Sequence, residues 1–295
     1  MLLQLLFEQL LNGLAVGSIY ALITLGLALV YGILRILHVA HAAVYTAGAY
    51  IGLWLYGQTG TLWLAVPGSM AACAVIGVLI ERFVYFPLLK FPAYVPLISS
   101  IALFIGIEEL CRLIAGPEIL TFPSQLQLPF PSLSVGEVTI SPTLLAVYTV
   151  TAIVLLFLWF ITTKTEFGLA MRAASQDMEV ASSLGVNSHL VISATFIIGS
   201  SIAAVAGILV GIYYNQVYST MGTVPAYKSL ALIVVGGMGS VPGVVLASLL
   251  LGLGETLLIG FANIPMPRDA LAFIAMIIVL LLRPQGLLGR RQGGK

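Results

Sequence analysis

Apolar runs of about 20 residues dominate this chain, and an α-helix needs that length to cross a bilayer. Hydrophobic residues make up 60% of its 295 residues and charged residues 8%, against roughly 25% charged residues in a soluble domain. A soluble globule of this length has too little interior to cover so much apolar surface. The runs are also longer than the alternating ~10-residue segments of a membrane β-barrel. The sequence therefore predicts an all-α, polytopic bundle of membrane-spanning helices.

Sliding windows of about 20 residues locate about eight predicted spans. The region 226–262 is interrupted by Gly236, Gly237 and Gly239, so we expect two elements there. The first, near 226–243, is expected to be a broken or re-entrant helix whose freed backbone groups line a cavity. The other spans are predicted near 10–33, 38–57, 61–80, 93–115, 142–162, 188–214 and 268–283.

Lys and Arg residues indicate which loops face the cytoplasm, because positively charged loops are retained there. The basic C-terminus, the segment 164–187, the stretch 82–90 and Arg35 are accordingly predicted to be cytoplasmic. The loop 116–141 contains no Lys or Arg and is predicted to lie outside, together with the N-terminus. The basic C-terminus consists of Arg283, Arg290, Arg291 and Lys295.

The loops are too short to form a separate soluble domain, so residues 1–295 are expected to be a single domain. Cys73 and Cys111 lie in apolar runs and are expected to be buried free thiols. Glycines four residues apart clear one helix face and allow close helix packing, which indicates a compact bundle. Such pairs are Gly13/Gly17, Gly48/Gly52, Gly207/Gly211 and Gly239/Gly243.

Several polar residues lie inside the predicted spans. Glu255 is either a functional carboxylate or a protonated or paired residue facing the bundle, because charges inside a membrane are costly. Arg112 follows Glu108 and Glu109 at a spacing that allows a local ion pair.

His38, His41 and Tyr45 have the spacing of one helical stripe at the start of a span. A metal site would need further ligands, such as a carboxylate or thiolate nearby. The stripe is therefore expected to be a polar seam that lines a pathway or hydrogen-bonds a neighbouring helix.

The segment 164–187, KTEFGLAMRAASQDMEVASSLGVN, is a charged stretch between two apolar spans. Residues 169–184 are expected to form an Ala-rich helix, with Gly168 before it and Gly185 at its C-cap. Such a helix is either a contact surface for another protein or an ordinary solvated loop.

No motif for nucleotide binding or catalysis is present. The sequence contains no GxxxxGK[ST], HExxH, GxSxG or CxxC. The run GGMGSVPG at 236–243 lacks the strand, helix and acidic residue of a dinucleotide-binding unit. The chain is therefore expected to be neither an enzyme nor a metal or cofactor protein, and ATP-driven transport would need a separate ATPase. A net charge of +1 gives no indication of a nucleic-acid partner.

The stretch EFGLAMRAASQDMEVASSLGVN resembles the cytoplasmic coupling segment of ABC-importer permeases, in the variant of the branched-chain amino acid uptake family. The likeness covers nearly the whole chain, and the size resembles the smaller of the two permease subunits. The family often has Asn at the position of His38 and Gly at the position of Ala42, which puts in doubt any transfer of substrate preference from this span. Two further stretches carry the likeness: LNGLAVGSIYALITLGLALVYGILRILHVAHAAVYTAGAY and ALIVVGGMGSVPGVVLASLLLG.

This resemblance implies a permease subunit of an ATP-driven ABC importer in a bacterial inner membrane, for branched-chain or related amino acids. The implied partners are a second homologous permease, two cytoplasmic ATPase subunits that use the ATP, a periplasmic substrate-binding protein and the lipid bilayer. Two alternatives stay open. In the first, the chain belongs to the same kind of importer but the substrate is urea, a short amide or another small organic acid. In the second, the chain is a stand-alone ion-coupled carrier that uses Glu255.

The resemblance also implies two sets of functional residues. In the docking segment, small side chains including Ala170, Ala174 and Ala181 would enter a groove on the ATPase, and charged ones would form ion pairs at its rim. The docking set is Glu166, Gly168, Met171, Arg172, Ala173, Asp177, Glu179, Ala181, Leu184 and Gly185. The predicted substrate pathway is Tyr20, His41, Tyr45, Gly48, Gly236, Gly237, Gly239 and Glu255.

Overall fold

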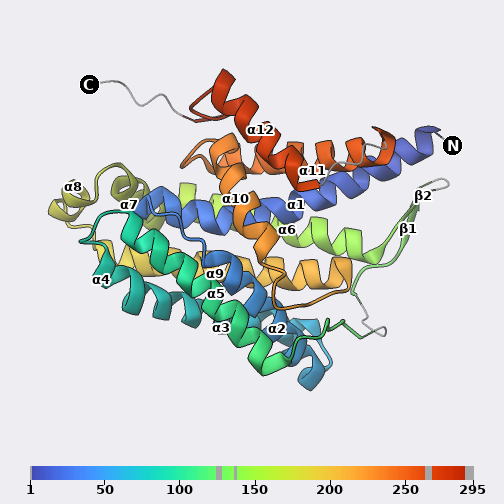
Figure 1. The fold of residues 1–295 in the computed structure, drawn as a ribbon, viewed down its shortest axis with the longest axis horizontal. Coiled ribbons are helices and arrows are strands. Elements are labelled where there is room, and N and C mark those ends of the chain that lie inside the picture. Colours follow the sequence, from blue (N-terminus) through green and yellow to red (C-terminus); the bar gives the residue numbers. More distant parts are fainter. Residues whose placement is uncertain (1, 124–127, 136–137, 263–267, 290–295) are drawn as a thin grey trace.

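The computed structural model describes residues 2–123, 128–135, 138–262 and 268–289. Three members of the predicted basic C-terminus, Arg290, Arg291 and Lys295, lie outside the described residues. Helices form most of the described chain (Figure 1). They are α1 (Leu2–Leu34), α2 (His41–Thr59), α3 (Leu62–Ile80), the π-helical turn η1 (Glu81–Tyr85), α4 (Phe86–Leu88), α5 (Tyr94–Ala115), α6 (Pro142–Lys164), α7 (Glu166–Gln176), α8 (Met178–Ser183), α9 (Ser188–Tyr214), α10 (Thr223–Gly236), α11 (Val241–Ala262) and α12 (Arg268–Leu282).

Five of the described helices, α1, α3, α6, α9 and α11, are long and apolar enough to cross a membrane. This confirms the predicted all-α membrane bundle. Its centre is formed by α1 and α9, since 89% and 72% of their most apolar windows are buried inside the chain. The corresponding buried shares are 28% for α3, 22% for α6 and 33% for α11, which places these helices at the periphery with apolar faces left for lipid or protein.

Helix boundaries coincide with capping residues in the sequence. Ser141 precedes α6, and its side chain accepts a hydrogen bond from the backbone N–H of Leu144. Asn187 precedes α9 and accepts one from the N–H of Leu190. Short oxygen-bearing side chains are favoured at these positions because the first N–H groups of a helix have no partner within it. Both helices therefore begin where the sequence predicted spans to begin.

Segments that the charge pattern assigned to opposite sides of the membrane lie at opposite ends of the bundle. Figure 1 places α4, α7 and α8 at one end, and the start of α1 with β1 (Leu133–Val135) and β2 (Val138–Ile140) at the other. These strands pair antiparallel with Val135 opposite Val138, a hairpin in the loop 116–141 that the sequence analysis did not predict. The same loop pairs with the segment that follows α9, through backbone hydrogen bonds between Leu120 and Val217 at 2.8 and 2.9 Å. The loop before α6 and the connection from α9 to α10 therefore lie on the same side of the bundle.

A break separates α10 from α11, as the glycine-rich run predicted. Gly237 and Gly239 have φ of 105° and 87°, values that residues with a Cβ rarely adopt. The hydroxyl of Ser240 then accepts a hydrogen bond from the N–H of Gly243 and starts α11. With its 14 residues, α10 is only about 21 Å long, against a hydrocarbon core of about 30 Å. The first element is too short to cross, as predicted.

Close helix packing at glycines is confirmed for two of the four predicted pairs and for one member of a third. Gly13 and Gly17 lie against α11, where Gly252 approaches the Gly17 backbone. Gly48 and Gly52 of α2 lie against α9, and Gly207 of α9 lies against α2. Its predicted partner Gly211 instead lies against the side chains of Phe122 and Val217, outside the helices. The pair Gly239/Gly243 does not share a helix face, because Gly239 lies in the turn before α11.

The expected free thiols are confirmed within the described residues, although Cys111 is only half-buried. The predicted local ion pair is formed by Arg112 with Glu109, at 2.6 Å between Nη2 and Oε2. Glu108 instead turns toward α10, where the Thr223 hydroxyl donates a hydrogen bond to it at 3.4 Å.

We expect Gly207→Ala to lower the free energy of unfolding by about 1–3 kcal/mol, the usual cost of overpacking a core. A Cβ there would lie against the carbonyl oxygen of Tyr45, closer than real Cβ contacts occur. Gly106→Ala is the matched control, since nothing lies within 4 Å of its added Cβ. Thermal unfolding of the purified chain in detergent measures both. Equal unfolding temperatures for the two variants would contradict the close approach of α2 and α9.

Candidate functional site

The segment 164–187 folds into two short helices. Thr165 starts α7, and its hydroxyl accepts a hydrogen bond from the N–H of Gly168 at 3.1 Å. Asp177 ends α7 with extended backbone, and its carboxylate accepts bonds from Glu179 and Val180 N–H at 2.9 and 3.0 Å. The predicted single helix over 169–184 is therefore wrong. Asp in a helix interior competes for backbone N–H groups, and here that competition starts a new helix.

Gly185 ends α8 as predicted. Its φ is 90°, and its N–H donates to the Ser182 carbonyl at 3.0 Å. The next N–H, of Val186, reaches back to the Ala181 carbonyl at 3.0 Å. These two bonds form a Schellman motif, which satisfies the last carbonyls of the helix. The connection from α8 to α9 is thus a defined turn.

Part of the predicted docking set faces the chain itself. Met171 and Ala181 are buried, together with Ala174, so the prediction that Ala174 and Ala181 enter a partner's groove is wrong. Gly168 is buried where a Cβ would meet the carbonyl oxygen of Thr162 in α6. The exposed members of the set are Glu166, Arg172, Asp177, Glu179, Leu184 and Gly185, while Ala173 is half-buried.

Polar contacts attach α7 to the membrane helices. The Arg172 guanidinium donates to the Thr162 carbonyl at the end of α6. Arg35, just after α1, donates to the Ser175 carbonyl at a long 3.4 Å. Through these two hydrogen bonds, α7 contacts the end of α6 and the residue that follows α1.

Three large apolar side chains of α7, α8 and the turn that follows point away from the chain. Leu169 is 61% exposed, Val180 55% and Leu184 80%. Large apolar side chains exposed on a segment that also carries charged residues are typical of a protein contact surface. We call these three residues the α7–α8 apolar surface.

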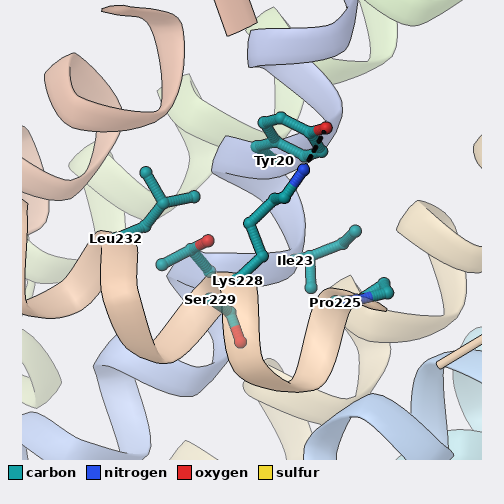
Figure 2. Close-up of a pocket in the computed structure, with 7 residues that line it drawn as sticks. Tyr20, Ile23, Pro225, Lys228, Ser229 and Leu232 are labelled. Carbon is teal, nitrogen blue, oxygen red and sulfur yellow. Dashed lines mark hydrogen bonds between the residues drawn. The ribbon is translucent and has the colours of Figure 1, made fainter. Parts of the chain in front are cut away.

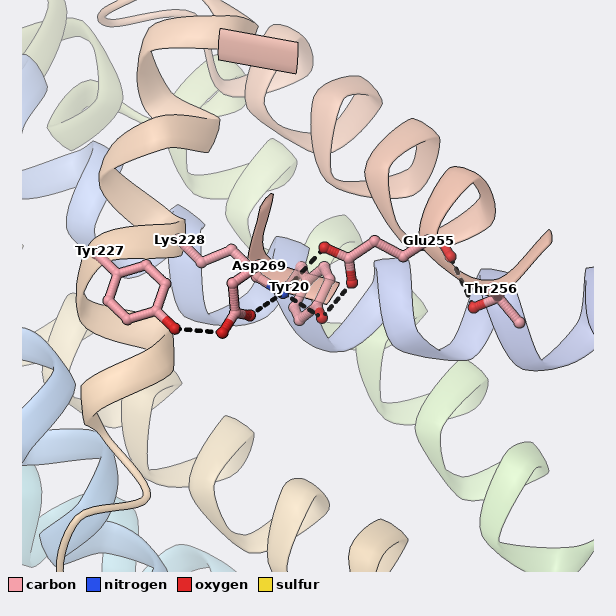
Figure 3. A network of polar contacts seen from close by, with 7 residues as sticks. Tyr20, Tyr227, Lys228, Glu255, Thr256 and Asp269 are labelled. Carbon is pink, nitrogen blue, oxygen red and sulfur yellow. Dashed lines mark hydrogen bonds and ion pairs between the residues drawn. The ribbon is translucent and has the colours of Figure 1, made fainter. Parts of the chain in front are cut away.

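A second candidate site is a buried charged network between α1, α10, α11 and α12 (Figure 3). The Lys228 ammonium lies 2.9 Å from Glu255 Oε1, and both side chains are 2% exposed. It also donates to the Tyr20 hydroxyl at 2.9 Å, while that hydroxyl donates to Glu255 Oε2 at 2.8 Å. Of the two structural alternatives for Glu255, the paired residue facing the bundle is the one observed.

The network extends to the start of α12. Asp269 Oδ1 lies 3.1 Å from the Lys228 ammonium, and the Tyr227 hydroxyl donates to Asp269 Oδ2 at 2.6 Å. Lys228 therefore has three oxygen partners, from α1, α11 and α12, which matches the three protons of an ammonium group.

Sequence reasoning missed Lys228, Tyr227 and Asp269. A signal for Lys228 was present in the sequence, because Lys228 and Glu255 lie in the same interrupted region and opposite charges inside a membrane tend to pair. Tyr20 and Lys228 are 208 positions apart, and no spacing rule connects them.

A small pocket lies beside this network, between α1 and α10 (Figure 2). Its apolar walls are Ile23, Pro225 and Leu232, and its polar atoms come from Tyr20, Thr24, Lys228 and Ser229. The Thr24 hydroxyl is fully buried and has no hydrogen-bond partner among the described residues.

The predicted histidine seam lies elsewhere, between α2, η1 and α9. His38 precedes α2, so His38, His41 and Tyr45 do not form one helical stripe. His38 Nδ1 lies 2.7 Å from the Tyr85 hydroxyl, a hydrogen bond to a neighbouring element as one of the two alternatives expected. His41 packs against Gly26 of α1.

The structure brings together only two members of the predicted substrate pathway, Tyr20 and Glu255. Tyr45 and Gly48 are buried in the contact between α2 and α9. Gly236 and Gly237 pack closely within the break, and Gly239 is open. The role of all these residues in transport stays a prediction.

The chain matches the family model described as the permease component of branched-chain amino acid transport systems, over residues 9–282. It is 35% identical to the high-affinity branched-chain amino acid transport system permease protein BraD of Pseudomonas aeruginosa, over 96% of this chain and 95% of that protein. It is 33% identical to the corresponding permease protein LivH of Escherichia coli K12, with the same coverage. A second permease protein of that organism, LivM, is 27% identical over 92% of this chain and 68% of its own length.

Proposed function

Because the chain belongs to the family of permease components of branched-chain amino acid transport systems, we propose that it forms part of the membrane pathway of an ATP-driven importer for branched-chain amino acids. The names of the relatives support this substrate, since BraD and LivH are both high-affinity branched-chain amino acid permease proteins.

The observation that carries the proposal is the α7–α8 segment. It combines apolar side chains exposed at one end of the bundle with hydrogen bonds to α6 and to the residue that follows α1. An ATPase that binds Leu169, Val180 and Leu184 and then moves would pull on α6 and α9 through the capped turns at Thr165 and Gly185. The exposed charges beside this surface, such as Glu179, set the orientation of docking at its rim.

The sequence has no phosphate loop, so ATP hydrolysis belongs to partner subunits and the chain itself needs no cofactor. We propose two such ATPases at the α7–α8 end, a substrate-binding protein at the opposite end, and a second homologous permease beside this one. Similarity to both LivH and LivM, two permease proteins of one organism, supports a pair of related permeases. The setting proposed is a bacterial inner membrane, with the α7–α8 end in the cytoplasm.

Reconstitution of all the subunits into vesicles tests this proposal. We expect ATP-dependent leucine uptake that requires this chain, the second permease, the ATPases and the binding protein. The ion-coupled alternative predicts the opposite pattern. Leucine uptake by this chain alone, driven by an ion gradient and independent of ATP, would overturn the proposal.

A further inference from the structure

Resting on the proposed function, we propose that the pocket between α1 and α10 is a transient binding site for the zwitterionic head group of an aliphatic α-amino acid. Lys228 receives the substrate carboxylate and Glu255 receives its ammonium group. Thr24 donates a further hydrogen bond to the carboxylate. Amino acids are thus recognised a second time, inside the membrane, after their capture outside it.

The composition of the pocket matches such a ligand. Ile23, Pro225 and Leu232 form an apolar wall that suits an aliphatic side chain. The Lys228 ammonium lines the pocket, and the carboxylate of Glu255, which is not a lining residue, lies 2.9 Å from that ammonium. A zwitterion carries the same two charges a few bonds apart. Apolar walls with a few convergent polar groups are typical of small-molecule sites.

Thr24 gives an independent indication of a ligand. Its hydroxyl lines the pocket, its residue is 0% exposed, and no described residue accepts or donates a hydrogen bond to it. A buried hydroxyl without a partner costs free energy. Among the described hydroxyls in this condition, Thr24 is the one that lines the pocket. An occupant of the pocket that accepts a hydrogen bond from Thr24 accounts for a threonine at this position.

The existing ion pair explains why both charges of the ligand matter. In this state, Lys228 pairs with Glu255 and with Asp269, and Tyr20 bridges Lys228 and Glu255. A zwitterion preserves the charge balance when it separates Lys228 from Glu255, because its carboxylate takes the place of Glu255 on Lys228 and its ammonium takes the place of Lys228 on Glu255. A ligand with only the carboxylate would leave Glu255 buried without a cation, and a ligand with only the ammonium would leave Lys228 with Asp269 as its one carboxylate partner; both are unfavourable.

In this state the pocket has room for about one water molecule, so an amino acid enters only when α1 and α10 separate. The helix α10 is short and discontinuous with α11, since it ends at the turn at Gly237. Discontinuous helices of this kind frequently form substrate sites in transporters. The site is therefore occupied during transport and closed by its own ion pair at rest.

The test is Thr24→Val in the complete importer, with all partner subunits, in vesicles. We expect leucine uptake to fall by about tenfold, the order of magnitude of one hydrogen bond to a charged group. The thermal unfolding temperature of the variant should not fall, because the hydroxyl has no hydrogen-bond partner to lose. The matched control is Thr151→Val in α6, since Thr151 is also a buried threonine without a hydrogen-bond partner but does not line the pocket. It should transport as the wild type does.

A second measurement addresses the two charges directly. Radiolabelled leucine retained by the importer in nanodiscs, without the binding protein, is competed with leucine, leucinamide and 4-methylpentanoate. We expect the two analogues, each lacking one charge, to compete at least tenfold less well than leucine. Equal competition by all three, or normal uptake by Thr24→Val, would overturn the binding site alone. Absence of leucine uptake by the wild-type importer would instead reject the proposed function, and the binding site with it.

Discussion

Lys228→Met is expected to lower the free energy of unfolding by about 3–5 kcal/mol, the usual cost of removing one partner of a buried ion pair. The substitution leaves Glu255 buried at 2% exposure without its cation and removes one partner of Asp269. Thermal unfolding of the purified chain and its yield in detergent measure the effect. The expected loss of unfolding free energy is larger than for Gly207→Ala, because an unpaired charge inside an apolar bundle costs more free energy than one excess methyl group.

Two further variants show whether the loss comes from the unpaired charge. Lys228→Met combined with Glu255→Met removes both charges and should recover most of the lost stability, since an apolar pair of similar volume often replaces a buried ion pair without cost. Lys90→Met removes a lysine that is exposed and should leave stability unchanged. If Lys228→Met unfolds at the wild-type temperature, the network does not stabilise the fold.

Leu184→Glu is expected to abolish ATP-dependent uptake, by about a hundredfold or more, while the chain still folds. Its side chain is 80% exposed in the chain alone, so the substitution buries nothing new. In the assembled importer, we expect the carboxylate to lie in an apolar contact with the ATPase. Disrupting one of the few residues that dominate the binding energy of an interface costs about 2 kcal/mol or more. Uptake in vesicles and co-purification of the ATPase with the permease measure the outcome.

The control for this variant is Leu184→Met, which keeps an apolar side chain of similar volume and should retain both uptake and ATPase binding. Equal unfolding temperatures of the two purified variants would show that neither substitution acts through folding. Normal uptake by Leu184→Glu would mean that the α7–α8 apolar surface does not contact the ATPase.

Much of the helix arrangement could be predicted because membrane spans depend on local composition. The span 188–214 has the same bounds as α9, and α5 begins and ends within one residue or so of the predicted 93–115. Gly185 was predictable as a helix end because glycine, without a Cβ, adopts the positive φ of a helix C-terminus at no steric cost. In each case a few adjacent residues carry the free energy that decides the structure.

Two local features were not predicted, because specific hydrogen bonds competed there with the structure that the average composition favours. Asp177 lies in an Ala-rich segment whose average composition favours a helix, yet its side chain caps α8 and breaks the segment in two. The hairpin of β1 and β2 was missed because each strand is only three residues long and lies in a Pro-rich loop. In both cases, a few specific hydrogen bonds outweighed the composition of the surrounding window.

By itself, the sequence determined that this chain lies in a membrane, where most of its spans run, and that it carries no phosphate loop for ATP. These follow from transfer free energies and motifs that add up along the chain. Only the tertiary structure decided that Lys228 pairs with Glu255 and that Tyr20 bonds to both of them. It also decided that Thr24 lines the pocket with a hydroxyl that has no hydrogen-bond partner among the described residues. Such contacts depend on where four helices converge, because a buried charge is stabilised by whichever partners the packing brings within hydrogen-bond distance.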